Sequence, residues 1–192
     1  MDLNLSLDYS CYVRSYKGSP RGGDIGVVTS FEDGMLAALI DASGHGLEAY
    51  AVAQKARSII LEYSNLMPDQ LLLILNEELR NSIGAAASIV RIRHEQLDFS
   101  GIGNVGAYLD RKPLIVKYGV LGSRMRTPEV ITRNFPKQAK FLMHTDGVSS
   151  SCVSFFDSDY SAELAVKKLV EKYGSHHDDA SAFVILRKHN SA

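Results

Sequence analysis

The chain has 192 residues, of which 45% are hydrophobic and 22% charged, the balance of an ordinary globular domain. Its net charge of -1 lacks the basic excess that non-specific nucleic-acid binding needs, and no stretch approaches the ~18 apolar residues of a membrane span. Cys11 and Cys152 lie far apart without metal-ligand spacing, and the opening MDLNLSLDYS is unlike a signal peptide. We therefore expect a single domain over residues 1–192 in a soluble cytoplasmic protein that binds neither nucleic acid nor membrane.

The first half of the chain predicts strands followed by two helices. A period of two indicates a half-buried first strand, whose shared face carries Leu3, Leu5, Leu7, Tyr9, Cys11 and Val13. Pro68 suits the first position of the second helix, which we expect to end near Asn81. The other expected elements are strands at 24–31 and 35–40, joined by a turn at 32–34, and a helix at 47–63.

The second half predicts a meander of strands and one more helix. Residues 114–135 show only short strands and loops. The expected elements are strands at 86–93, 97–103, 107–109, 140–145 and 182–186, and a helix at 158–173 with Leu164, Val166, Leu169 and Val170 on its apolar side. Runs of strands separated by helices predict an α+β fold with antiparallel sheets and helices packed outside.

Acidic residues recur at the ends of the expected strands, where a charge is costly to bury. Asp41 and Asp146 each end an apolar strand, Asp24 begins one, and Asp178 and Asp179 precede the last. Carboxylates gathered at one edge of a core repel one another unless a cation compensates. Mg²⁺ or Mn²⁺ bound through oxygen is the natural compensation, and two ions ~3.5–4 Å apart can activate a water and clamp a phosphate.

A simpler interpretation exists for each of these positions taken alone. Asp-Gly is a common turn dipeptide, and aspartate often caps a helix start. Their coincidence at four strand ends favours a divalent-metal site, although the spacing of the acids leaves the reaction open.

Six short blocks follow one another along the chain. They are Gly-Gly-Asp (22–24), Asp-Ala-Ser-Gly-His-Gly (41–46), Gly-Ala-Ala-Ala-Ser (84–88), Gly-Asn-Val-Gly (103–106), His-Thr-Asp-Gly-Val (144–148) and Asp-Asp-Ala-Ser (178–181). In this order they resemble the metal-dependent serine/threonine protein phosphatases of the PPM family. The similarity extends to its bacterial SpoIIE-like branch and, within that branch, to the feedback phosphatases of the stressosome. The resemblance runs from about residue 8 to the end of the chain and implies an antiparallel β-sandwich flanked by α-helices, with a metal site at the sandwich edge.

The resemblance also implies a role for each acid. Asp41 matches the carboxylate that bridges two Mn²⁺ or Mg²⁺ ions, and the carbonyl of Ala42 matches the backbone ligand. Asp146 and Asp178 match the other ligands of the first ion, and Asp24 matches an early acid near the second, often bound through water. Asp41, Asp146 and Asp178 would then be catalytic through a metal-bound water.

The sequence departs from the family pattern in two respects. Asp-Asp-Ala-Ser replaces the more usual Asp-Asp-hydrophobic-Thr, and the phosphate-binding arginine of eukaryotic relatives has no clear counterpart, with Arg14 and Arg21 as candidates. The histidines near the acids are expected to act outside the metal ligand set, as loop or hydrogen-bonding groups; they are His45, His144, His176 and His177.

Three functions are compatible with these residues. The first is a monomeric phosphatase that removes phosphate from phosphoserine or phosphothreonine of STAS-domain stressosome proteins, as negative feedback. The second is a catalytically inactive phosphatase-fold adaptor that binds the same scaffold. The third is a metal-dependent phosphohydrolase of small molecules, although a nucleotide triphosphatase of the P-loop class is disfavoured because the glycine-lysine loop is missing.

Overall fold

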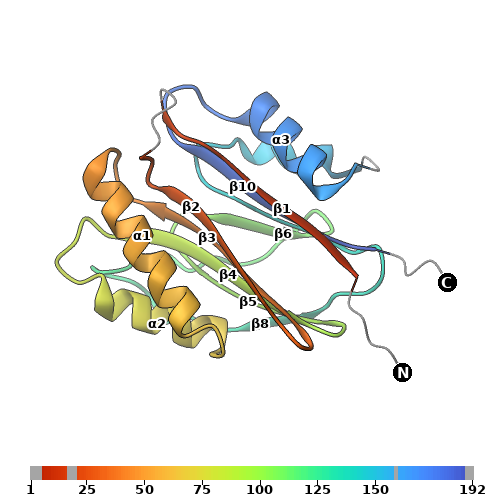
Figure 1. Ribbon diagram of the computed structural model, residues 1–192, viewed down its shortest axis with the longest axis horizontal. Helices are drawn as coiled ribbons and strands as arrows, with labels where there is room; N and C mark the ends of the chain where they lie inside the picture. Colours follow the sequence, from red (N-terminus) through yellow and green to blue (C-terminus); the bar gives the residue numbers. More distant parts are fainter. Residues whose placement is uncertain (1–5, 17–20, 158–159, 189–192) are drawn as a thin grey trace.

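Two antiparallel sheets face one another in the computed structural model, which describes residues 6–16, 21–157 and 160–188 (Figure 1). The first sheet has the spatial order β1 (Leu7–Arg14), β10 (Ala180–Arg187), β9 (Lys140–His144), β6 (Gly106–Leu109) and β7 (Lys112–Pro113). The second has the order β2 (Asp24–Phe31), β3 (Gly34–Ala42), β4 (Ala85–Arg93), β5 (Gln96–Ile102) and β8 (Ile131–Asn134). This arrangement confirms the predicted α+β class with an antiparallel β-sandwich.

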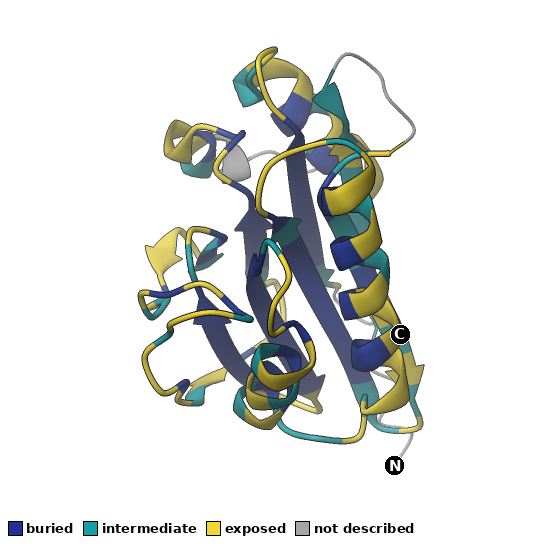
Figure 2. Ribbon diagram, turned by 90° about the vertical axis from the view of Figure 1, so that its left-hand side faces the viewer, coloured by how far each residue is buried: buried dark blue, intermediate teal, exposed yellow. Residues whose placement is uncertain are grey.

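Helices cover the outer face of each sheet. On the second sheet lie α1 (Leu47–Glu62) and α2 (Pro68–Glu78), and on the first sheet lies α3 (Ala162–Tyr173). A 3-10 helix, η2 (Ser150–Asp157), leads toward α3. The central strands are buried between these layers while the helices expose their outer sides (Figure 2). None of the described helices has the length and apolar character needed to cross a membrane.

Both faces of β3 are buried, which explains its nearly continuous apolar sequence. Leu36, Ala38 and Ile40 pack against α1 and α2, whereas the alternate residues fill the space between the sheets. Continued alternation puts Asp41 on the inner face at the end of the strand. The strand therefore delivers a carboxylate to the open end of the sandwich.

The first strand differs from its expected pattern. Leu7 and Cys11 pack into the sandwich interior, but Tyr9 is 40% exposed and Val13 is 36% exposed. The reason is that β1 lies at the edge of the first sheet, paired only with β10 among the described strands. The predicted positions 3 and 5 lie outside the described residues.

The remaining differences concern the start of α3, the Leu164 side chain and the end of α2. α3 begins at Ala162, because the Ser161 side chain accepts a hydrogen bond from the amide of Leu164 and so caps the helix start. The Leu164 side chain is exposed, contrary to its expected place on the apolar side. α2 ends at Glu78, and Asn81 beyond it takes a positive φ of 63° that does not continue a helix.

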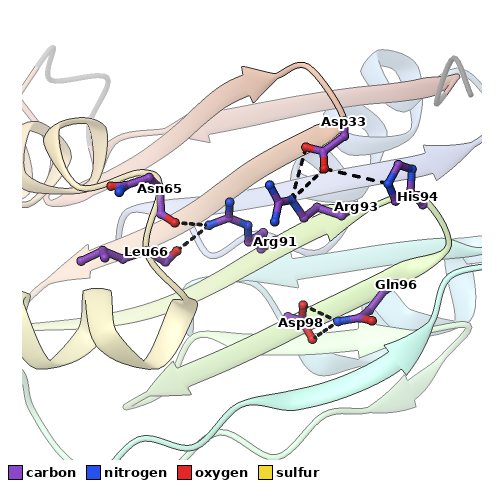
Figure 3. A network of polar contacts seen from close by, with 8 residues as sticks. All are labelled: Asp33, Asn65, Leu66, Arg91, Arg93, His94, Gln96 and Asp98. Carbon is purple, nitrogen blue, oxygen red and sulfur yellow. Dashed lines mark hydrogen bonds and ion pairs between the residues drawn. The ribbon is translucent and has the colours of Figure 1, made fainter.

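An arginine anchors the connection between α1 and α2 to the second sheet (Figure 3). Arg91 of β4 is only 5% exposed, and its Nη1 donates to the carbonyls of Asn65 and Leu66 at 2.7 and 2.8 Å. Its guanidinium lies over the ring of Phe31, 4.7 Å from the centroid. The buried guanidinium thus satisfies two carbonyls of this loop from beneath.

Candidate metal centre

Ends of strands from both sheets enclose a cleft of about 600 Å³. Three carboxylates, those of Asp41, Asp146 and Asp178, line it together. The other lining residues are Ser43, Gly44, His45, Ala85, Ala86, Gly103, Asn104, Tyr118, Gly119, Val120 and His177. The structure therefore brings together three of the acids that the sequence predicted, from three separate stretches of the chain.

Asp41 has an environment unfavourable to its charge. Burial, followed by the nearby carboxylates, raises its pKa from 3.8 to about 8. The carboxylates concerned are, in decreasing order of effect, Asp24, Asp146, Asp178 and Asp179. Every charge that shifts this group is negative, so a cation placed here would relieve repulsion from all of them.

Asp24 lies opposite Asp41 in the register of β2 and β3, on the protein side of the cleft. Its carboxylate is 7% exposed and accepts a hydrogen bond of 2.8 Å from the hydroxyl of Thr145. Burial raises its pKa to about 7, even though hydrogen bonds from Thr145 and Ser181 act in the other direction. Asp24 itself does not line the cleft.

Asn104, just before β6, holds Asp146, which follows the neighbouring strand β9. Its amide Nδ2 donates to Oδ2 of Asp146 at 2.5 Å, and both side chains line the cleft. Sequence reasoning included Asn104 only as part of a matching block and assigned it no role. A carboxylate oriented by an amide in this way keeps its other oxygen available.

A buried aspartate next to Asp178 organises the backbone around the site. Asp179 accepts hydrogen bonds of 2.6 Å from the amides of Tyr16 and Gly23, so it fixes the chain just before Asp24. Gly147, which follows Asp146, passes so close to the Asp179 carbonyl that a Cβ there would collide with it. Because Gly147 has no side chain, the strand ends that carry Asp146 and Asp179 can pack against each other.

The turn before α1 bends sharply over the cleft. Gly44 and Gly46 have φ of 79° and 83°, a backbone conformation that residues other than glycine rarely adopt. Gly23 packs against the Ala42 carbonyl and accepts a hydrogen bond of 3.1 Å from the Ala42 amide. Ser43, Gly44 and His45 of this turn line the cleft, so the turn forms part of its wall.

The basic candidates lie in different places. His45 and His177 line the cleft, whereas His144 stacks on Tyr108 with ring centroids 5.7 Å apart, and its Nδ1 lies 2.9 Å from the Thr145 carbonyl. Arg14 donates instead to the carbonyls of Val170 and Ser175. His176 and Arg21 are exposed and are not part of the cleft lining.

The acidic residues suit a hydrated divalent cation. Within the described residues, no three His, Cys, Asp or Glu side chains converge into a ready-made metal cage. Mg²⁺ and Mn²⁺ do not need one, because they are commonly held by a few carboxylates and retain several waters. Three carboxylates around one open cleft fit such a site, whereas Ala42, the predicted backbone ligand, is fully buried outside the cleft lining with its carbonyl against Gly23.

Comparison with known proteins gives a consistent result. No family model matches the chain. The phosphoserine phosphatase RsbX of Bacillus subtilis is 25% identical over 157 residues, covering 78% of each chain. The crystal structure of RsbX in complex with magnesium has a TM-score of 0.86 at 21% identity, covering 96% of this chain and 97% of that one.

Two further solved structures share the fold. A chain solved in work on the bacterial stressosome has a TM-score of 0.84 at 23% identity, with 94% of this chain and 99% of that one covered. The catalytic domain of the serine/threonine phosphatase PstP, in complex with two manganese ions, has a TM-score of 0.75 at 13% identity, with 95% and 99% covered. The predicted resemblance to PPM-type phosphatases, and among them to RsbX, is confirmed.

Proposed function

We propose that this chain is a Mn²⁺- or Mg²⁺-dependent phosphatase that removes phosphate from phosphoserine or phosphothreonine of STAS-domain stressosome proteins. In this proposal it acts in the cytoplasm as a monomer and provides negative feedback on the scaffold. The main observation that supports this function is the cleft in which Asp41, Asp146 and Asp178 come together. Resemblance to the phosphoserine phosphatase RsbX supports both the enzyme class and the metal.

Five groups would hold two ions. The carboxylates of Asp41, Asp146 and Asp178 and the Ala42 carbonyl would bind them directly, and Asp24 would act through water. Bound there, the ions supply an activated water as nucleophile and neutralise charge on the phosphoryl oxygens. No side chain of the protein then has to form a covalent bond with phosphorus.

The residues of the chain itself orient the reacting groups. Asn104 donates to one oxygen of Asp146 and so holds this carboxylate in the cleft. Ala85 and Ala86, both small, line the cleft and leave space for a phosphorylated side chain.

The inactive adaptor is less well supported by the site. Burial, together with the gathered carboxylates, raises the pKa of Asp41 to about 8, which costs folding stability at neutral pH. A binding module would gain nothing from that cost, whereas a metal site needs the carboxylates. The structure therefore favours catalysis over binding alone.

The direct test measures phosphate release from a phosphorylated STAS-domain protein, and from a panel of small phosphoesters, with and without Mn²⁺. Metal-dependent release should disappear on chelation and fall at least about 100-fold in Asp146→Asn. Asp110→Asn is a matched control, because Asp110 is an exposed turn residue whose hydrogen bond from the Lys140 amide an asparagine can also accept.

The three alternative functions predict different outcomes. Full activity in an Asp41→Ala/Asp146→Asn double variant would refute the proposal. Calorimetry that shows no binding of Mn²⁺, together with tight binding of the scaffold, would favour the adaptor. Turnover of small phosphoesters only would favour the small-molecule enzyme.

A further inference from the structure

A hairpin at residues 118–126 lies beside the carboxylate cleft and has no part in the chemistry proposed above. Its two arms are joined by hydrogen bonds from the Val120 amide to the Arg124 carbonyl (2.9 Å) and from the Arg126 amide to the Tyr118 carbonyl (3.1 Å). Gly122 makes the turn with a φ of 85°. We call this segment the 118–126 hairpin.

The 118–126 hairpin is anchored to the rest of the fold. Leu121 is fully buried and exchanges two backbone hydrogen bonds with Ala85 of β4, at 2.8 and 3.2 Å. The Gly122 amide donates to Oδ1 of Asn76 on α2 at 3.0 Å, and a side chain at Gly122 would collide with the Leu79 carbonyl. The segment therefore presents its outer face in a fixed arrangement.

That outer face combines two cations with two exposed apolar groups. Met125 packs toward the core under α1 and α2, so the residues on either side of it, Arg124 and Arg126, point outward. Across from them, Tyr118 is 85% exposed and Val120 is 39% exposed. With respect to the other described residues, neither guanidinium forms an ion pair or a hydrogen bond.

The hairpin also connects the cleft to a second hollow. This hollow, of about 560 Å³, is lined by Ser123, Arg124, Met125 and Arg126 together with residues 118–120. Residues 118–120 line the carboxylate cleft as well. A polypeptide that places one side chain in the cleft can thus continue over residues 118–120 to reach the arginines.

We propose that the 118–126 hairpin docks an acidic segment next to the phosphorylated residue of a protein substrate. Arg124 and Arg126 are two residues apart on an extended strand, about 7 Å, which matches carboxylates at alternate positions of an extended peptide. Tyr118 and Val120 supply apolar contact beside them. The inference rests on the proposed phosphatase function and adds a substrate preference to it.

The test uses two phosphoserine peptides that differ only in their flank, one with glutamates at alternate positions and one with glutamines. We expect the wild-type protein with Mn²⁺ to prefer the acidic peptide about fivefold in kcat/KM, mainly through KM. Arg124→Gln/Arg126→Gln should abolish the preference and leave turnover of para-nitrophenyl phosphate unchanged. The double variant of two exposed arginines elsewhere, Arg57→Gln/Arg133→Gln, removes the same charge and should keep the preference.

Salt dependence and charge reversal test the electrostatic origin of the preference. The preference should shrink as KCl rises from about 50 to about 500 mM, because exposed ion pairs are screened. Charge reversal, Arg124→Glu/Arg126→Glu, should favour a peptide with lysines in the flank. A wild-type preference that survives in Arg124→Gln/Arg126→Gln, or no wild-type preference at all, would overturn the docking site.

A failure of the phosphatase proposal can be distinguished from a failure of the docking site. If the wild-type protein with Mn²⁺ hydrolyses neither peptide nor para-nitrophenyl phosphate, that proposal fails. Fluorescence anisotropy with the labelled, unphosphorylated acidic peptide then still decides the docking site. Weaker binding in Arg124→Gln/Arg126→Gln than in wild type supports it, and equal binding refutes it.

Discussion

Replacing Asp41 by asparagine should stabilise the metal-free protein while destroying its metal site. Asparagine has nearly the same shape as aspartate but carries no charge at any pH. It therefore removes the group whose ionisation is opposed by burial and by four neighbouring carboxylates. We expect a gain in the free energy of unfolding at the cost of function.

The magnitude follows from the pKa of Asp41. The unfolded chain ionises this group above its ordinary pKa of 3.8, whereas the folded protein holds it protonated up to about pH 8. At pH 7 this difference corresponds to about 4 kcal/mol, at 1.36 kcal/mol for each pH unit above 3.8. The repulsion is shared with other acids, so we expect a measured gain of about 2 to 4 kcal/mol, or roughly 5 to 10 °C in Tm.

The pH dependence has a definite sign. Because the folded pKa of Asp41 lies above the ordinary value, the stability of the metal-free wild-type protein falls as pH rises from about 4 to about 8. Asp24, with a pKa raised to about 7, adds a fall in the same direction. In Asp41→Asn the fall should be shallower, because only Asp24 remains to produce it.

Urea unfolding in the presence of a chelator, at about pH 5 and about pH 8, measures the effect. Asp110→Asn should stay within about 0.5 kcal/mol of wild type at both pH values. Added Mn²⁺ should raise the Tm of the wild-type protein and of Asp110→Asn, but not that of Asp41→Asn. If Asp41→Asn is no more stable than wild type at pH 8 without metal, the electrostatic account of the site is wrong.

Three other substitutions test separate features. Gly147→Ala forces a methyl group into the Asp179 carbonyl, so it should lower stability by about 1 to 3 kcal/mol and weaken Mn²⁺ binding, measured by urea unfolding and calorimetry. Asn104→Ala releases Asp146 and should raise the Mn²⁺ concentration for half-maximal phosphatase activity about 10- to 100-fold, with an unchanged Tm. Arg91→Met leaves two carbonyls of the α1–α2 loop without their donor, so it should cost about 2 to 3 kcal/mol in urea unfolding while kcat/KM stays at the wild-type value.

Several parts of the fold were predictable because they depend on local sequence. The expected hairpin turn at residues 32–34 sets the register of β2 on β3, and that register places Asp24 opposite Asp41. The small residues at 84–88 and the glycines before α1 likewise mark close packing and a sharp turn. The irregular segment 114–135 was not predictable, because its shape comes from contacts with β4 and α2 rather than from its own pattern.

By itself, then, the sequence determined which acids end strands, since strand pattern and turn residues act within a few positions. Those positions predicted a divalent-metal site among Asp24, Asp41, Asp146, Asp178 and Asp179, and the resemblance to the PPM family narrowed the set to the first four. Tertiary structure alone decided that three of these acids line the cleft while Asp24 lies behind it, hydrogen-bonded to Thr145. It also gave Asn104 its partner and set two arginines beside the cleft, because those contacts join segments far apart in the chain.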